Sequence, residues 1–128
     1  MFMNSMFTKI VRILLGLVLV LFGLNKLLPN PFIPLPELPT KAADFMTSLA
    51  NTGYVLKTLG FLEIMIGAML LLKKWVAFAL IVLVPISLNI LLFHLFLDAS
   101  GIGGALLVAI LNGILIYKHW SQYRSLFL

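Results

Sequence analysis

Four long apolar stretches, separated by short polar segments, dominate the pattern of this chain. They cover residues 10–28, 54–72, 75–97 and 102–120, and each approaches the roughly 20 residues that an α-helix needs to cross a bilayer. The connections at 73–74 and 98–104 are short, which favours antiparallel neighbours. We therefore predict an all-α chain, an integral membrane antiparallel four-helix bundle that forms a single transmembrane domain over residues 1–128.

The longest connection, an outer loop at residues 29–53, has two unlike parts. The first, PNPFIPLPELP, repeats proline so closely that it excludes a helix and favours an extended, stiff backbone. The second, TKAADFMTSLANTG, predicts a short interfacial helix, capped by Thr40 and ended by Gly53. Its apolar face comprises Ala42, Met46, Leu49 and Ala50.

The composition also indicates that much of this chain is surrounded by lipid. Hydrophobic residues make up 62% of it and charged residues 10%, against about 45–50% and about 25% in soluble domains. This balance excludes a soluble enzyme, a disordered chain and a nucleic-acid-binding module. There is no cysteine, which excludes disulfides and Cys-ligated zinc or iron–sulfur centres. His119 lies in the inner tail, so it cannot pair with His94 as a second haem ligand.

The distribution of basic residues predicts an orientation. Six of them gather at one set of span ends: Lys9, Arg12, Lys73, Lys74, Lys118 and Arg124. Because basic residues are retained on the cytoplasmic side, we expect both termini in the cytoplasm. The net charge of +5 then reflects topology and contact with anionic lipid.

Polar side chains within apolar spans are costly, and they usually face protein or a cavity. Lys26 and His94 lie near the outer ends of their spans, whereas Glu63 lies six residues below Lys57, or ~9 Å at ~1.5 Å per residue. Helical side chains lean toward the N-terminus of their helix. Lys26 and His94 therefore lean into the membrane, and Glu63 and Asn112 lean back toward the outer face.

We accordingly predict that Lys26, Glu63, His94 and Asn112 converge in the outer third of the bilayer. Asn89 lies about 140° around its helix from His94 at ~100° per residue, so it faces a different neighbour. The candidate ligand-binding residues are Lys26, Glu63, His94, Asn112, Asn89 and Asn25.

Small residues mark the faces on which these helices would pack. Gly16 and Gly23 roughly share a face with Lys26, and Gly60 and Gly67 share one with Glu63. A third stripe, on the last span, could serve the bundle core or a dimer face, and we expect the core because Asn112 lies beside it. Its members are Gly101, Ala105, Ala109 and Gly113.

Each polar residue also has a purely structural interpretation. Glu63 and Lys26 can form an ion pair that joins two spans, His94 can bond Asp98 one turn later, and Asn112 can hold two helices together. The sequence leaves these alternatives open beside the ligand-binding interpretation.

Three motifs resemble the DoxX family of small four-span membrane proteins. They are FGLNKL at the end of the first span, EIMIGAMLLL in the second and NILLFH in the third. Phe22-Gly23 stands where family members commonly have Ser-Gly. The resemblance implies a redox-associated or accessory membrane protein. Some members of the family are implicated in membrane oxidoreductase assemblies, including ones that pass electrons from sulfur compounds to quinone. With the charge asymmetry, the resemblance places the chain in a prokaryotic inner membrane.

Three functions follow as hypotheses. The first is a redox-associated subunit with a polar site for a quinone headgroup, which needs a partner subunit to deliver electrons. The second is a structural or assembly protein without catalytic activity, and the third is a binder of a small anion or lipid headgroup through Lys26 and His94. A homo-oligomer is compatible with each.

Overall fold

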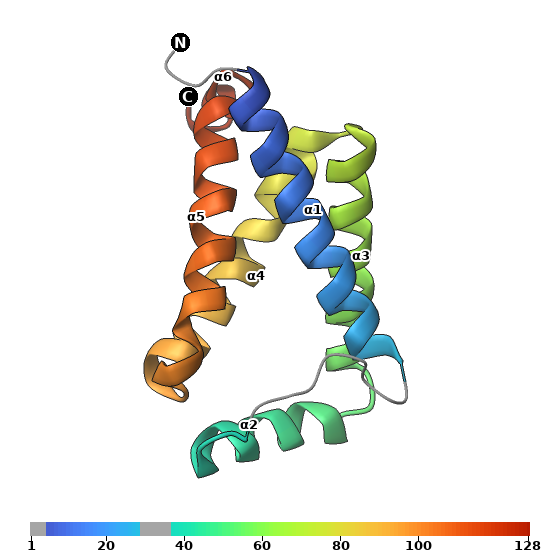
Figure 1. Cartoon of the computed structure of the whole chain (residues 1–128), viewed down its shortest axis with the longest axis vertical. Coiled ribbons are helices and arrows are strands. Elements are labelled where there is room, and N and C mark those ends of the chain that lie inside the picture. The colour runs from blue at the N-terminus through green and yellow to red at the C-terminus, as the bar shows by residue number, and fades with distance from the viewer. Residues whose placement is uncertain (1–4, 29–36) are drawn as a thin grey trace.

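The computed structural model describes residues 5–28 and 37–128 (Figure 1). Within these residues the chain forms helices and connections, with no strand. The helices are α1 (Ser5–Leu27), α2 (Thr40–Asn51), α3 (Val55–Leu72), α4 (Val76–Phe96), η1 (Ala99–Gly101), α5 (Ile102–Lys118), α6 (Trp120–Tyr123) and η2 (Arg124–Phe127). The proline-rich prediction falls mostly on residues 29–36, which lie outside the described residues.

Four of these helices are long and apolar enough to cross a membrane: α1, α3, α4 and α5. Protein buries only 22–33% of the most apolar window of each, so most of their apolar surface faces outward. Such a surface is stable only against lipid, which identifies a small integral membrane protein. The predicted spans are confirmed as helices, although the first begins at Ser5 rather than Ile10.

The long helices are arranged as two pairs. α1 packs along α3, and α4 packs along α5, while α1 also touches α5 and α3 touches α4. The start of α1, the α3–α4 connection and the end of α5 lie at one end of the molecule (Figure 1). We call this the basic end, since Lys9, Arg12, Lys73, Lys74, Lys118 and Arg124 all belong to it. The opposite end is the α2 end.

Apolar core residues concentrate in the half nearer the basic end. The buried cluster joins Val11, Leu15 and Leu19 of α1 to Ile66 and Leu70 of α3, Ala79, Leu80 and Leu83 of α4, and Val108, Leu111 and Leu115 of α5. Toward the α2 end the two helix pairs separate in Figure 1, and the buried residues of α1 and α3 there are Gly23, Asn25, Gly60 and Glu63. Asn25 and Glu63 thus lie beyond the apolar core.

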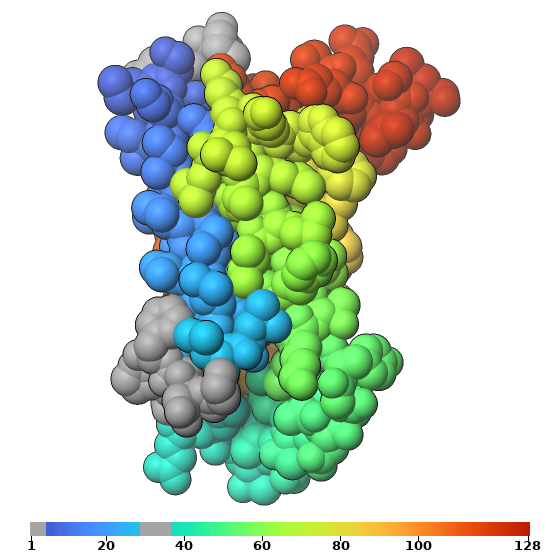
Figure 2. All heavy atoms as spheres, turned by 90° about the vertical axis from the view of Figure 1, so that its right-hand side faces the viewer, coloured from blue at the N-terminus to red at the C-terminus, as the bar shows by residue number. Residues whose placement is uncertain are grey.

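Two glycine pairs bring α1 and α3 into backbone contact. A Cβ on Gly67 would lie 2.7 Å from the carbonyl oxygen of Gly16, and a Cβ on Gly23 would lie 2.6 Å from that of Gly60. Both distances are shorter than any stable contact, so only glycine fits. The pairing also shows that the two helices run antiparallel, and Figure 2 shows their side chains in close contact along this face.

The glycine and alanine stripe of α5 differs from its prediction. Ala105 is buried, but Gly113 is exposed and a Cβ there would meet nothing within 4 Å. The prediction that the whole stripe faces the core is therefore wrong. The core face is instead Ala105, Val108, Leu111, Asn112 and Leu115, because α5 turns its larger side chains toward α4.

α2 lies across the end of the molecule opposite the basic end (Figure 1). Its predicted helix is present and Gly53, at φ 83°, follows its end, but Thr40 makes no capping bond and is the first helical residue instead. The preceding Pro39 supplies its carbonyl to Ala43. Phe45, absent from the predicted apolar face, lies 5.7 Å from the Phe93 ring of α4, and Ala50 of that face is exposed.

We predict that Gly67→Ala lowers the free energy of unfolding by about 1–3 kcal/mol, because its methyl group would overlap the Gly16 carbonyl. Gly113→Ala is the matched control, since it adds the same methyl group in open space and should leave stability unchanged or raise it. Thermal unfolding in detergent measures both. Equal effects of the two substitutions would contradict the close contact between α1 and α3.

Candidate functional site

A buried ion pair joins α1 to α3. The Lys26 ammonium lies 2.8 Å from Oε1 of Glu63, and the Lys26 and Glu63 side chains are 24% and 3% exposed. The predicted contact between these residues is therefore confirmed. The Glu63 side chain is therefore enclosed by protein, whereas the Lys26 side chain is partly exposed.

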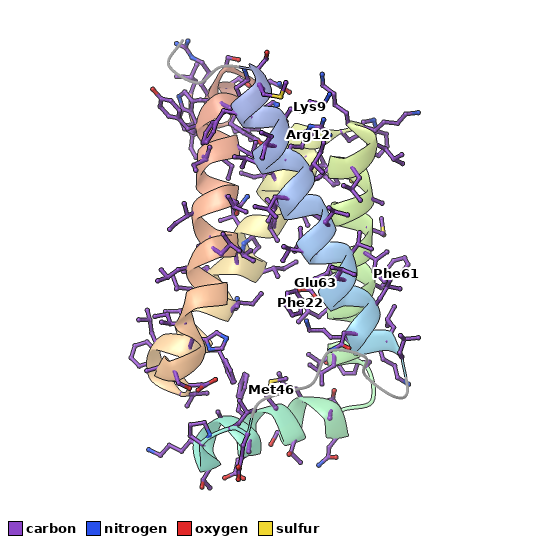
Figure 3. The ribbon with its side chains drawn as sticks, viewed as in Figure 1. Lys9, Arg12, Phe22, Met46, Phe61 and Glu63 are labelled. Carbon is purple, nitrogen blue, oxygen red and sulfur yellow. The ribbon has the colours of Figure 1, made fainter. Side chains whose placement is uncertain are left out.

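Backbone contact positions this pair. Lys26 follows Gly23 by one turn of α1, and Glu63 follows Gly60 by one turn of α3. A Cβ on Gly60 would lie 3.1 Å from Cβ of Lys26, so the missing side chain makes room for the lysine stem. Glu63 points inward, whereas Phe61 on the same helix points away from the bundle (Figure 3). Asn25, beside Lys26, is also buried.

Asn112 joins α5 to α4. Its side-chain amide donates to the carbonyl oxygen of Leu80 at 3.1 Å, and its Oδ1 accepts a hydrogen bond from the Ser87 hydroxyl at 3.2 Å. All three side chains are buried. These contacts correspond to the structural interpretation of Asn112, in which it holds two helices together.

His94 belongs to a polar cluster at the start of α5. Its Nδ1 lies 3.0 Å from the carbonyl oxygen of Asp98, which can only accept, so Nδ1 carries the hydrogen. The Asp98 carboxylate lies 3.5 Å from the same nitrogen and accepts a hydrogen bond from Ser100 at 2.8 Å. A Cβ on Gly101 would lie 2.7 Å from the imidazole, so a larger residue there would displace the His94 side chain. The predicted His94–Asp98 contact is confirmed.

Asn89 is exposed, and its amide donates to the carbonyl oxygen of Pro85 in its own helix at 2.8 Å. The contacts thus divide the candidate residues into separate groups. Lys26 and Glu63 join α1 to α3, Asn112 joins α5 to α4, and His94 stays at the end of α4. Their role toward a ligand stays a prediction.

Two hydrogen bonds that the sequence does not predict fix the basic end. The Arg12 guanidinium donates to the carbonyl oxygen of Leu70, in the last turn of α3. The Tyr123 hydroxyl donates to the carbonyl oxygen of Ala77 at 2.6 Å, and burial raises the pKa of this phenol, so it remains a donor at neutral pH. Their partners lie 58 and 46 residues away, so spacing along the chain gives no signal for either bond.

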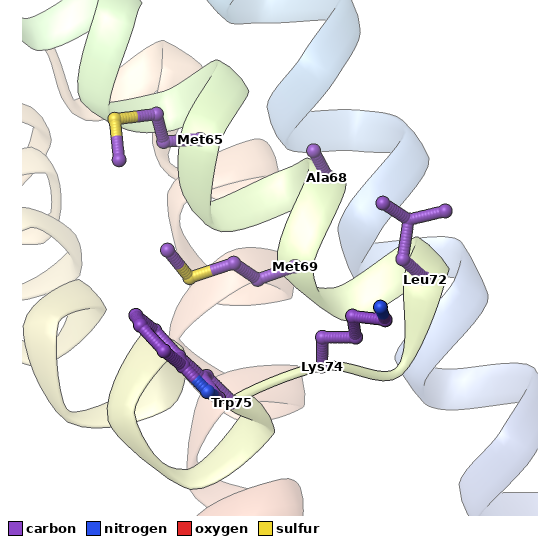
Figure 4. A pocket seen from close by; sticks show the side chains of 6 residues that line it. All are labelled: Met65, Ala68, Met69, Leu72, Lys74 and Trp75. Atoms are coloured by element: carbon purple, nitrogen blue, oxygen red, sulfur yellow. The ribbon is translucent and has the colours of Figure 1, made fainter.

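A cavity of about 510 Å³ opens between α3 and the start of α4 (Figure 4). Its lining is apolar apart from Lys74: Met65, Ala68, Met69, Leu72 and Trp75. Without converging polar groups it suits the acyl chain of a lipid rather than a reacting ligand. Among the described residues, no three His, Asp or Glu side chains lie close enough together to hold a metal ion.

Comparison with known proteins gives no relative from which a function could be inferred, so any function must be argued from these contacts. No protein-family model, no curated protein and no solved structure matches the chain.

We predict that Glu63→Gln and Lys26→Met each lower the free energy of unfolding, by up to about 3–5 kcal/mol, because each strands a buried partner. The double variant should recover part of the loss, with a coupling of about 0.5–3 kcal/mol. Lys57→Met, at an exposed position of the same helix, is the control and should couple to neither substitution. Strictly additive losses would show that Lys26 and Glu63 do not interact in the folded protein.

Proposed function

We propose that this chain is an accessory subunit of a membrane oxidoreductase, with a binding site for a quinone headgroup at the Lys26–Glu63 pair. One observation carries the proposal: a Glu63 side chain enclosed by protein is paired with a Lys26 side chain that remains partly exposed. Ionisable groups within membrane spans are costly, and they commonly mark sites of ligand or proton movement. The resemblance to DoxX proteins points to the same class of function.

The chemistry of the pair suits a quinone. A headgroup presents two carbonyl oxygens, which need hydrogen-bond donors, and its reduction takes up protons. The Lys26 ammonium has three N–H donors and lies 2.8 Å from Oε1 of Glu63, with which it forms an ion pair. The Glu63 carboxylate can hold and release a proton. The chain has no cysteine, so in this proposal the electrons come from a metal- or flavin-bearing partner subunit.

A structural or assembly role is the second candidate. It is favoured by the glycine contacts beside the ion pair and by the Asn112 contacts between α4 and α5, all of which would fix helix packing without a ligand. The third candidate, an anion or headgroup site on Lys26 and His94, has less support because Nδ1 of His94 is already bonded to Asp98.

We propose a prokaryotic inner membrane, as the DoxX resemblance implies, and the charge asymmetry supports an orientation with the basic end in the cytoplasm. The chain has no cysteine, so the reactivity of a single introduced cysteine shows on which side of the membrane that position lies. We expect cysteines introduced at Ser5 and Ser125 to resist a membrane-impermeant thiol reagent in intact cells, and one at Thr47 in α2 to react. Labelling of a cysteine at Ser5 or Ser125 in sealed cells would contradict this orientation.

The quinone site can be tested on protein purified in a mild detergent. We expect mass spectrometry to detect a co-purifying quinone, and decylubiquinone added as a probe to raise the unfolding temperature. Glu63→Gln keeps the shape of the side chain and removes its charge, so it should abolish both effects in protein that still folds. Lys57→Gln, which removes an exposed charge from the same helix, should preserve them.

Two results would contradict the quinone site. The first is wild-type protein that carries no quinone and does not respond to decylubiquinone, which would favour the structural candidate. The second is folded Glu63→Gln protein that binds the probe as the wild type does, which would place the binding elsewhere.

A further inference from the structure

A second cavity, of about 550 Å³, lies at the basic end, away from the Lys26–Glu63 pair. It is lined by side chains from the first turns of α1, from the α3–α4 connection and from the end of α5. Four of them are cationic: Lys9, Arg12, Lys73 and Lys118. None of its lining residues in the described part of the chain is acidic. Lys9 and Arg12 mark its place on α1 in Figure 3.

The cations converge from segments far apart in the sequence. Four like charges around one cavity repel each other, and no carboxylate among its lining residues compensates them. An anion bound there would remove this repulsion and gain charge-assisted hydrogen bonds. The positive-inside rule explains basic residues at this end, but it does not require that they face a common cavity.

Two contacts hold this lining in place. The Arg12 guanidinium donates to the carbonyl oxygen of Leu70, which fixes it between α1 and α3 and leaves further N–H donors of its five for a ligand. Nδ1 of His119, which also lines the cavity, donates to the carbonyl oxygen of Leu115 at 2.9 Å. An arginine fixed in this way is well suited to bind a phosphate group, because its planar fork of N–H donors matches the phosphate oxygens.

The cavity also has an apolar side, formed by Met6, Val76 and Leu115. A phosphate group attached to acyl chains could therefore place its charge among the cations and its chains along the outer surface of the helices. Basic cavities between membrane helices on the cytoplasmic side bind anionic headgroups in this manner.

We propose that the cavity at the basic end is a binding site for a phosphate group, supplied by an anionic phospholipid of the surrounding membrane. This site is separate from the quinone site, because it lies at the other end of the bundle and uses different residues.

Purified protein with two matched double variants tests the proposal. Lys9→Gln/Lys118→Gln removes two charges from the cavity lining. Lys57→Gln/Arg124→Gln removes two exposed charges outside this cavity, the second of them at the same end. Unfolding temperatures establish first that both variants fold. Native mass spectrometry then measures the binding of dioleoylphosphatidylglycerol, dioleoylphosphatidylcholine and inorganic phosphate.

We expect wild-type protein to prefer phosphatidylglycerol to phosphatidylcholine, and the cavity variant to bind phosphatidylglycerol about tenfold or more weakly, as the loss of charge-assisted bonds implies. The control variant should stay within about twofold, because exposed charges are screened. Equal losses in the two variants, or no preference for the anionic lipid, would overturn the proposal. Inorganic phosphate that binds as tightly as the lipid would support the phosphate site and reject the lipid as its source.

Discussion

Two helices can bring their backbones together only where neither carries a side chain at the crossing point. α1 and α3 meet this condition twice, at Gly16 with Gly67 and at Gly23 with Gly60. The second contact lies one helical turn from the Lys26–Glu63 pair, and it sets the separation across which the ammonium reaches the carboxylate at 2.8 Å. The ion pair in turn disfavours other relative positions of α1 and α3, because a shift of either helix would leave a charge unpaired in an apolar surrounding. Each proposed role for the pair depends on this contact.

Features that follow from local periodicity were predictable from the sequence. The length of the apolar runs predicted the four long helices, and glycines recurring on one face predicted the α1–α3 contact. The pairing of Lys26 with Glu63 followed from depth and from the direction in which helical side chains lean. His94 and Asp98 are one turn apart, so their contact also needed no knowledge of the tertiary structure.

Features that depend on how the helices are rotated and crossed could not be predicted. A stripe of small residues fits a packed face or a lipid-facing one equally well, and the turn of α5 that buries Asn112 leaves Gly113 exposed. The bonds of Asn112 run to residues 25 and 32 positions away, so they too depend on the crossing of α4 and α5. The cavity at the basic end collects cations from α1, the α3–α4 connection and α5, which the sequence presents only as an asymmetry of charge.

The central claim is that an ion pair between Lys26 and Glu63 exists in the membrane. The chain has only one other glutamate, Glu37. In a Glu37→Gln variant, Glu63 is therefore the only glutamate that carries the label. Solid-state NMR of such protein in lipid bilayers, with ¹³C at the glutamate carboxyl carbon and ¹⁵N at the lysine ammonium, measures the dipolar coupling between them. The account predicts strong dephasing of the Glu63 carboxyl signal, lost when Lys26 is replaced by Met. A signal that does not dephase, or that dephases equally without Lys26, would contradict it.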